Sequence, residues 1–268
     1  MRGVSADLYD LAVLESALAG TVFAGKLHFS PLTDSTNSDA QAAARRAAPH
    51  GSVYFADEQL AGRGRGDHAW HSAAGAGLYA SVLLRPPIPS VRLPLLPLAV
   101  GLAAAEAIRA VAGLTVDLRW PNDLMIGPRK VGGILVESKI SSGSADFAVV
   151  GIGINVHQRA FDSDLSTPAT SLDLEAGRKV SRQELLLSLL KSLECETLLL
   201  ADPAAGVTIP ARVEQASTWI RGRSVEVHGP QACTGVTTGL DENGFLLVRT
   251  DSGVVTVQTG GIRAAEIS

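Results

Sequence analysis

Apolar residues recur along the chain at two different spacings, which separate the expected helices from the expected strands. In some segments they return every three or four residues, the period of a helix with one buried face. Other segments are short apolar runs between glycines and polar turn residues, which is typical of strands. The expected helices span residues 7–19, 39–48, 93–111 and 181–200, with a short one from Pro210. The expected strands span residues 26–32, 52–56, 77–84, 115–120, 132–139 and 147–156.

Strands in the first part of the chain often follow one another without a helix between them. A parallel sheet requires a long crossover between consecutive strands, whereas an antiparallel pair needs only a turn. The order of elements therefore predicts an α+β fold in which helices flank a mixed or largely antiparallel sheet.

The pattern changes after Trp219, where only short strand-like segments remain. They span residues 224–228, 233–240, 245–250 and 254–258, and polar turns that contain glycine join them. Several short strands in a row are typical of a small antiparallel barrel or sandwich. The sequence therefore predicts two domains, a larger one at residues 1–221 and a small β domain at residues 222–268.

Composition and charge limit the kinds of partner that we expect. Of the 268 residues, 46% are apolar and 19% are charged, as in a folded protein with a sizeable core. The 23 basic and 27 acidic residues leave a net charge of −4, which provides no general attraction for nucleic acid or an acidic membrane. The longest apolar stretch, residues 93–105, contains two prolines and is shorter than the roughly 20 residues that cross a bilayer. We therefore expect neither nucleic acid nor a membrane as a partner.

The chain has two cysteines, Cys195 and Cys233, and neither has another cysteine or a histidine at the spacing of a metal-ligand pair. A disulfide framework or a structural zinc site is therefore not expected. The first residues include Asp7, Asp10 and Glu15 and lack the uninterrupted apolar stretch of a signal peptide. These features predict a cytoplasmic location.

The most distinctive local feature is a glycine-rich loop, residues 62–66, with the sequence Gly-Arg-Gly-Arg-Gly. Glycines let a backbone approach a ligand closely, and arginines present planar donors to phosphate or carboxylate oxygens. The loop does not match the nucleotide P-loop, and Asp67 stands where a dinucleotide-binding fingerprint has its third glycine. These residues alone leave two interpretations open, an anion-binding loop and a solvated basic surface loop.

Two further clusters place polar side chains at the ends of expected strands. Residues 119–123, Arg-Trp-Pro-Asn-Asp, end one strand, and Lys130 starts the next. Residues 149–155 form an apolar strand in which two glycines leave space on one face and Asn155 stands at the end. Side chains on rigid strand ends can project into a site. The alternative to a functional site is a purely structural role for each residue. Trp120 would then belong to the core, Asn122 and Asp123 would cap a turn, and Lys130 would be solvated. The glycines of residues 149–155 would make room for a neighbouring helix.

Two other kinds of site are disfavoured. Asp67, His68 and His71 lie close together in sequence and could suggest a metal site. No other strong metal ligand lies near them in the sequence, so a metal site is not expected here. The chain has no Gly-x-Ser-x-Gly elbow, and neither cysteine lies in a motif, so a covalent nucleophile is not expected.

Taken together and in order, five segments resemble the motifs of biotin protein ligases. The segments are Ser35-Thr36-Asn37, Gln59 to Trp70 with Gly62-Arg63-Gly64-Arg65 inside it, Arg119-Trp120-Pro121-Asn122-Asp123, Lys130 with Gly133-Ile134-Leu135-Val136-Glu137, and Gly151-Ile152-Gly153-Ile154-Asn155. The resemblance extends from about Leu27 to the end of the sequence. It implies a class II synthetase-like mixed sheet, as in biotin and lipoate ligases, followed by a small SH3-like β-barrel. Because only 25 residues precede Lys26, too few for the helix-turn-helix domain of some members, the resemblance is to the monofunctional type without a DNA-binding domain.

The resemblance implies an ATP-dependent ligase with two half-reactions. The carboxylate of biotin attacks the α-phosphate of ATP to give biotinyl-5′-AMP and pyrophosphate, and a lysine of an acceptor protein then attacks the mixed anhydride. The implied cofactors are ATP, biotin and Mg²⁺, and the implied partner is the biotin carboxyl carrier domain of a biotin-dependent carboxylase. A homodimer is compatible with the resemblance, which assigns no protein ligands to the metal.

The resemblance also assigns roles to individual residues. The residues assigned to biotin are Ser35, Thr36, Gln59, Gly62, Arg63, Lys130 and Gly133. The residues assigned to ATP are Arg63, Arg65, Trp70, Asn122, Lys130 and Asn155. Trp70 would stack on adenine, and Asn155 would lie near the triphosphate and Mg²⁺.

Three residues receive catalytic roles from the resemblance. Lys130 would bridge the biotin carboxylate and the α-phosphate, which reduces the repulsion between two anions. Arg65 would tie the glycine-rich loop to the acyl phosphate, and Asp123 would orient or deprotonate the incoming lysine amine.

The chain departs from the family pattern at Asp67-His68, where the family usually has Gly-Arg. This departure weakens the expected grip of the segment on phosphates, although His68 could substitute when it is protonated or hydrogen-bonded. Lipoate ligase is the nearest alternative, and it is disfavoured because Trp-Pro-Asn-Asp and Gly-Arg-Gly-Arg resemble the biotin branch. A biotin-sensing regulator without catalysis is disfavoured by the net charge of −4 and by the lack of a helix-turn-helix segment.

Overall fold

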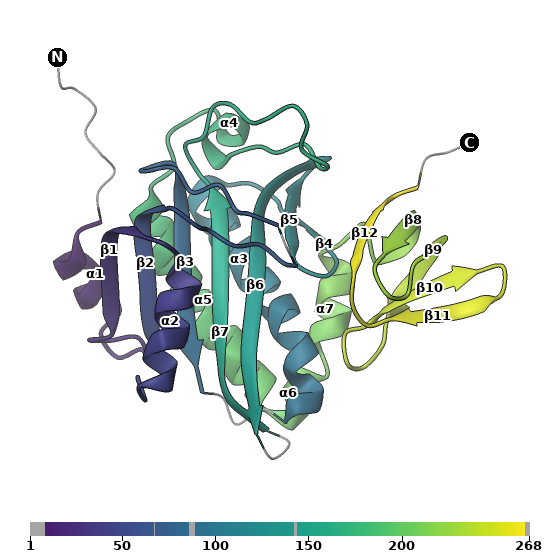
Figure 1. Cartoon of the computed structure of the whole chain (residues 1–268), viewed down its shortest axis with the longest axis horizontal. Coiled ribbons are helices and arrows are strands. Elements are labelled where there is room, and N and C mark those ends of the chain that lie inside the picture. Colours follow the sequence, from purple (N-terminus) through teal and green to yellow (C-terminus); the bar gives the residue numbers. More distant parts are fainter. Residues whose placement is uncertain (1–8, 67, 86–88, 142–143, 266–268) are drawn as a thin grey trace.

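A seven-stranded mixed sheet forms the larger part of the structure (Figure 1). The computed structural model describes residues 9–66, 68–85, 89–141 and 144–265. Strands β1 and β2 are parallel, and every other neighbouring pair in this sheet is antiparallel. In sheet order the strands are β1 (Leu27–Thr33), β2 (Ser52–Gln59), β3 (Gly77–Leu84), β7 (Ser144–Asn155), β6 (Arg129–Ser141), β5 (Asp123–Ile126) and β4 (Asp117–Arg119). The predicted α+β fold with a mixed, largely antiparallel sheet is confirmed.

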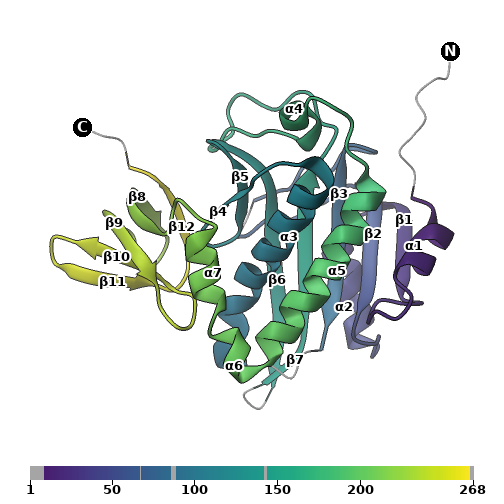
Figure 2. The same cartoon turned by 180° about the vertical axis from the view of Figure 1, so that it is seen from behind.

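Helices cover both faces of this sheet. Helix α2 (Thr36–Arg45) lies on one face across β2, β3 and β7, and α3 (Leu96–Ala112) and α5 (Arg182–Ala201) lie side by side on the other face (Figure 2). The remaining helices are short: α1 (Leu11–Ala17), η1 (Ser90–Leu95), α4 (Leu172–Ala176), α6 (Pro203–Gly206) and α7 (Ile209–Gln215). Because both faces are covered, β3 is buried along its whole length.

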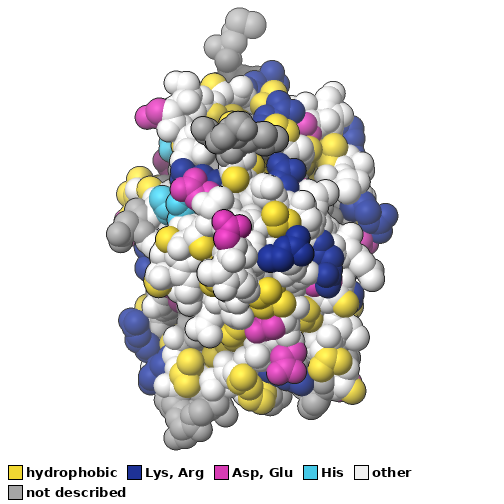
Figure 3. Space-filling model, turned by 90° about the vertical axis from the view of Figure 1, so that its right-hand side faces the viewer, with side chains coloured by type: hydrophobic (Ala, Val, Ile, Leu, Met, Phe, Trp, Pro, Cys, Tyr) yellow, Lys and Arg dark blue, Asp and Glu magenta, His cyan; other side chains and the backbone are white. Residues whose placement is uncertain are grey.

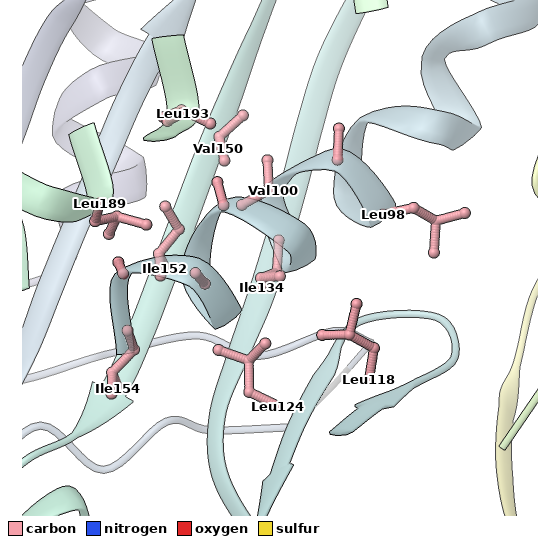
Figure 4. Packing of buried hydrophobic residues seen from close by; sticks show 14 of the residues in the cluster. Leu98, Val100, Leu118, Leu124, Ile134, Val150, Ile152, Ile154, Leu189 and Leu193 are labelled. Atoms are coloured by element: carbon pink, nitrogen blue, oxygen red, sulfur yellow. The ribbon is translucent and has the colours of Figure 1, made fainter. Parts of the chain in front are cut away.

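The main apolar core lies between the sheet and the layer formed by α3 and α5. Figure 4 shows Val150, Ile152 and Ile154 of β7 among leucines and valines from these two helices. Successive residues of a strand point to opposite faces. The two glycines between these three residues therefore face the other side of the sheet, where α2 lies.

Helix α3 accounts for the most apolar stretch of the chain. Residues Ser90–Ala112 are long and apolar enough to cross a membrane, but 61% of their most apolar window is buried inside the structure. The helix packs against the sheet, α5 and α7, which is the setting that an all-round apolar helix requires in a globular core.

The single helix predicted at residues 93–111 is wrong in its first turn. A 3-10 turn ends at Leu95, and α3 begins at Leu96. Pro94 and Pro97 have no N–H groups to donate, so the two elements can meet here without losing backbone hydrogen bonds.

A five-stranded antiparallel sheet forms the C-terminal part of the described chain. In sheet order its strands are β11 (Gly253–Val257), β10 (Leu246–Thr250), β9 (Cys233–Leu240), β8 (Arg221–His228) and β12 (Gly261–Ala264). Val225, Val227, Leu246 and Val248 are buried in it, and they belong to the same apolar cluster as the core of the larger domain. Strand β8 begins at Arg221, and the exact boundary at residues 221 and 222 stays a prediction.

Two tryptophans connect this small domain to the larger one. Trp120 donates from Nε1 to the carbonyl oxygen of Gly244 at 3.1 Å. The ring of Trp219 contacts two guanidinium groups, and its centroid lies 5.4 Å from Cζ of Arg119 and 4.6 Å from Cζ of Arg223. On the outer face of the small domain, acidic, basic and hydrophobic side chains are interspersed (Figure 3).

A buried ion pair connects the first turn of α5 to the sheet. The side chain of Arg182 is only 1% exposed, and its Nη1 atom lies 2.8 Å from Oδ1 of Asp57. The same nitrogen is 3.3 Å from the carbonyl oxygen of Gly77. Removal of one partner from such a pair leaves an uncompensated charge in a poorly hydrated place.

We predict that Arg182→Met lowers the free energy of unfolding by about 3 kcal/mol, because Asp57 loses its cationic partner. Urea denaturation followed by circular dichroism measures this change. Arg45→Met is the control, since Arg45 is exposed on α2, and it should shift the free energy by less than about 0.5 kcal/mol. Equal effects of the two substitutions would contradict the prediction.

Candidate active site

The predicted site residues converge on the face of the sheet that carries α2. Gly133 of β6 pairs with Asp123 of β5 on one side and with Gly153 of β7 on the other. Paired residues of antiparallel strands point to the same face. The Asp123 carboxylate therefore lies beside a strip of two adjacent glycines, which we call the glycine strip (Gly133 and Gly153).

The indole of Trp70 covers the glycine strip. A Cβ atom at Gly153 would lie 2.6 Å from Cε2 and Nε1 of Trp70, and one at Gly133 would lie 3.5 Å from Cζ3 of the same ring. The Nζ atom of Lys130 is 5.5 Å from the ring centroid. Among the described residues, the buried Nε1 atom of Trp70 has no hydrogen-bond partner. It is therefore a donor that a ligand could use.

The segment from Gln59 to Ser72 folds back on itself over the sheet. The Trp70 amide donates to the Gly62 carbonyl at 2.8 Å, and the Gly64 amide donates to the His68 carbonyl at 2.7 Å. A Cβ atom at Gly62 would overlap the Trp70 carbonyl oxygen, so only glycine allows the two strands of the loop to approach this closely. The glycine-rich loop thus forms a narrow hairpin rather than an open coil.

A carboxylate between two cations lies at the edge of the site. Asp123 Oδ1 is 2.5 Å from Nζ of Lys130, and Oδ2 is 2.6 Å from Nη2 of Arg119. Burial alone would raise the pKa of Asp123, but the charges and hydrogen bonds of Lys130 and Arg119 outweigh that effect and lower it. Asp123 therefore stays ionised at neutral pH, which favours the predicted orienting role over the predicted role of a base.

A hydrogen-bond network lies on the opposite side of the glycine strip, at the start of α2. The amide and the hydroxyl of Thr36 donate to Oε1 of Gln59 at 2.9 and 3.1 Å. The Thr36 and Ser81 hydroxyls are 2.8 Å apart, and Ser81 donates to Oδ1 of Asn37 at 2.5 Å. Asn37 in turn donates from Nδ2 to Glu137 at 2.8 Å. The network supplies polar groups of fixed orientation to a ligand that reaches it.

The network includes four residues to which the sequence assigned no role, and Asn37 is one of them. Ser81 is a buried hydroxyl in an otherwise apolar strand, Ser72 accepts from Nε2 of Gln59 at 2.7 Å, and Glu137 binds both Asn37 and a loop arginine. Ser81 could have been found as a polar residue inside an apolar run, whereas Ser72 carried no such signal. Ser35 occupies the N-cap position of α2 and is buried.

The structure directs the two loop arginines to different partners. Arg63 Nη2 lies 2.9 Å from Oε2 of Glu137 on β6. Arg65 instead reaches the C-terminal domain, where its Nη2 donates to Oγ1 of Thr259 at 2.7 Å and its Nη1 donates to the carbonyl oxygen of Gly260. Burial lowers the pKa of Arg65, and the nearby negative charge of Asp123 opposes that shift.

The two predicted asparagines are held by backbone carbonyl groups. Asn122 donates from Nδ2 to the carbonyl oxygen of Ile134 at 2.7 Å, so its amide fixes the turn between β4 and β5 against β6. Asn155, which is buried, donates from Nδ2 to the carbonyl oxygen of Thr170 at 3.0 Å. The Oδ1 atom of each asparagine takes no part in these two hydrogen bonds.

The departure at residues 67 and 68 is described only in part. Asp67 lies outside the described residues, and His68 is exposed. Among the described residues, no group of three or more histidine, cysteine, aspartate or glutamate side chains is arranged to hold a metal ion. Because the disfavoured metal site includes Asp67, the expectation that Asp67, His68 and His71 hold no metal stays a prediction.

The glycine strip, covered by the Trp70 indole, lies between a polar network on one side and the Lys130 ammonium on the other, and these groups are suited to a small ligand with an anionic end. Residues 29–155 match the model of the biotin/lipoate A/B protein ligase family. The bifunctional ligase/repressor BirA of Bacillus subtilis is 31% identical over 250 residues, which cover 88% of this chain and 73% of that protein. The biotin--[acetyl-CoA-carboxylase] ligase of Mycobacterium tuberculosis is 32% identical over 238 residues, which cover 86% and 85%.

Solved structures give the same result. The biotin protein ligase from Aquifex aeolicus in complex with biotin and ATP superposes with a TM-score of 0.79 at 31% identity, over 90% of this chain and 100% of that one. The chain belongs to the biotin/lipoate A/B protein ligase family. The predicted resemblance and the fold that it implied are confirmed.

We predict that Asp123→Asn lowers the free energy of unfolding by about 3 kcal/mol at pH 7, because two cations lose their shared counterion. The folded pKa of Asp123 is below the ordinary value of about 3.9, so its ionised form stabilises the protein above that pH. This contribution disappears as the pH falls through the lower folded pKa. The difference between the parent and the variant should therefore shrink in acid.

Urea denaturation at pH 7 and near pH 3 measures both differences. Glu106→Gln is the control, since Glu106 pairs with Arg109 on the exposed face of α3 at 2.7 Å. Exposed pairs contribute little, so this variant should match the parent at both pH values. A destabilisation by Asp123→Asn that grows in acid would exclude the assigned charge state.

Proposed function

We propose that the protein catalyses the ATP-dependent ligation of biotin to a lysine of an acceptor protein through biotinyl-5′-AMP. The observation that carries this proposal is the pair of polar groups on either side of the glycine strip, which the Trp70 indole covers. The network of Thr36 and Gln59 lies on one side, and the Lys130 ammonium held by Asp123 lies on the other. Biotin has the matching distribution, with a polar ureido ring at one end, an apolar body and a carboxylate at the far end. The biotin and ATP in the Aquifex aeolicus complex support this assignment.

The first half-reaction joins two anions. A carboxylate oxygen of biotin forms a bond to the α-phosphorus of ATP, and the bond from that phosphorus to the bridging oxygen breaks, which releases pyrophosphate. Lys130 stabilises the approach of the two anions because its ammonium is fixed in place by Asp123 at 2.5 Å. The free Nε1 donor of Trp70 can bind an acceptor atom of the ligand.

The second half-reaction transfers the biotinyl group. The neutral amine of the acceptor lysine attacks the acyl carbon, a carbon–nitrogen bond forms, and AMP leaves as the acyl–oxygen bond breaks. The proton that the amine loses passes to solvent or to the departing phosphate. Because the lowered pKa of Asp123 makes it a weak base, we assign this carboxylate to holding Lys130 and orienting the amine.

Mg²⁺ would bind together with the nucleotide and would supply positive charge beside the phosphates. In nucleotide sites Mg²⁺ is bound mainly by phosphate oxygens and water, with one or two oxygens from the protein. Asn155 uses its amide nitrogen for the Thr170 carbonyl, which leaves Oδ1 for a cation. The residues therefore fit a cation that arrives with ATP, and such a cation would neutralise part of the charge on the phosphates.

We infer that the acceptor is the biotin carboxyl carrier domain of a biotin-dependent carboxylase. The names of two relatives, both biotin--[acetyl-CoA-carboxylase] ligases, support this inference. A cytoplasmic location and a homodimer stay predictions from the sequence.

Exchange of radiolabelled pyrophosphate into ATP tests the proposed function. The reversible first half-reaction predicts exchange that depends on biotin, and lipoate should not replace biotin. Exchange with lipoate alone would place the protein in the lipoate branch. Exchange with neither acid would exclude an adenylate-forming ligase.

We predict that Lys130→Ala keeps its fold and part of its affinity for biotin but loses adenylate formation about a hundredfold, or roughly 3 kcal/mol of transition-state stabilisation. The reason is that the ammonium contact is strongest while the two anions react. Pyrophosphate exchange and biotin binding measure the two effects separately. Lys139→Ala is the control, because Lys139 is an exposed lysine of the same strand, 3.4 Å from Asp146. Nearly normal exchange in Lys130→Ala would contradict the assignment.

We predict that Arg65→Gly still forms biotinyl-5′-AMP but releases it about ten to a hundredfold faster, since a charge-assisted hydrogen bond contributes about 1.5 to 3 kcal/mol. Free intermediate would then biotinylate lysines of bystander proteins. Biotin incorporation into albumin, measured beside incorporation into the carrier domain, reports this leakage. Arg45→Gly, at an exposed arginine of α2, is the control. If Arg65→Gly forms adenylate but labels albumin no more than the parent does, Arg65 does not retain the intermediate.

A further inference from the structure

The guanidinium of Arg65 crosses from the catalytic domain to the C-terminal domain. It donates to the Thr259 hydroxyl at 2.7 Å and to the carbonyl oxygen of Gly260, residues that are 194 and 195 positions away in sequence. A guanidinium has five N–H donors in a rigid plane. Two of them bind this turn, so three remain for an anionic ligand. Arg65 can therefore bind the C-terminal domain and a phosphate at the same time.

The turn that receives Arg65 is held firmly in place. Gly260 adopts a φ of +118°, and a Cβ atom there would overlap the carbonyl oxygen of His228. The next residue, Gly261, pairs with His228 in the register of β12 with β8. The backbone of Gly229 also lies close to this turn, since a Cβ atom at Gly229 would lie 3.0 Å from the Cα of Gly260. The Gly260 carbonyl thus has a direction that is set by the backbone of the small domain.

The same small domain also supports the other side of the site. Gly244 accepts the hydrogen bond from Trp120, which lies in the turn that leads into β5, and Asp123 is the first residue of that strand. The glycine-rich loop and the turn before β5 are therefore both anchored on one body. A shift of the small domain would move Arg65 relative to the glycine strip.

We propose that the C-terminal domain holds the glycine-rich loop over the bound acyl-adenylate, and that Thr259 is the positioning residue that fixes Arg65 for this task. The proposal rests on the proposed function, because it concerns the intermediate of that reaction. Water must be kept from an acyl-adenylate, and a loop that is anchored at a second domain opens less often than a free one. Loss of the Thr259 hydroxyl removes one of the two anchors of Arg65 and leaves the Gly260 carbonyl.

Thr259→Val tests the proposal in the full-length chain, since it removes the hydroxyl and keeps the branched shape. We expect adenylate formation close to that of the parent, while release of biotinyl-5′-AMP and labelling of albumin rise about three- to tenfold. Thr259→Ser restores a hydroxyl and should behave as the parent does. Thr256→Val is the matched control, because Thr256 is exposed on β11 of the same domain.

Two further measurements separate positioning from a general structural effect. In an Arg65→Gly background, Thr259→Val should add nothing to release, because the residue through which it acts is gone. Amide hydrogen exchange at residues 62–66 of the protein alone should be faster in Thr259→Val than in the parent and in Thr259→Ser. An additive effect in the double variant would overturn the proposal, as would unchanged exchange and unchanged release in Thr259→Val.

The outcomes also distinguish this proposal from the proposed function. If the parent forms no adenylate with biotin but Thr259→Val speeds hydrogen exchange in the loop, the chemistry is wrong and the positioning of Arg65 by Thr259 stands. If the parent forms adenylate and Thr259→Val changes neither exchange nor release, the positioning is wrong and the chemistry stands.

Discussion

The site depends on one buried carboxylate that is shared by two cations. Asp123 costs free energy to bury, and only the ion pairs with Lys130 and Arg119 keep it charged. Arg119 also donates to Thr167 and lies against the ring of Trp219. The carboxylate therefore connects strands β4, β5 and β6 to the segment that leads into the small domain. A neutral side chain at position 123 would leave two cations to repel each other beside the glycine strip.

A second constraint is the absence of side chains along part of the sheet. The alternation of β7 sends Val150, Ile152 and Ile154 into the core, and the glycines between them face α2 and the loop. Gly151 makes room for the side chain of Asn37, since a Cβ atom there would overlap Asn37 Oδ1. One face of this strand thus packs into the core, and its glycine face makes room for the side chains of Asn37 and Trp70.

The sequence was sufficient for features that depend on local pattern. The strand at 77–84 matches β3 because an apolar run between turns has no competing structure, and Ser181 caps α5 as its position before the leucine-rich run indicated. Strand β5 escaped prediction because its first residue belongs to the Trp-Pro-Asn-Asp segment, which has the composition of a turn. Strand β12 also escaped prediction, because it is only four residues long and depends on pairing with β8 rather than on a local pattern.

The partner of Arg65 could not be predicted, because no local pattern relates residues 194 positions apart. Two arginines of the same loop have different partners, although their side chains are chemically identical. Arg63 binds the sheet through Glu137, and Arg65 binds the small domain through Thr259. A hairpin that is anchored to two bodies can close only when those bodies are correctly placed. The small β domain therefore has a physical reason to be part of the enzyme although the glycine strip lies entirely in the larger domain. Closure over a water-sensitive intermediate then depends on the contact between domains, not on the loop alone.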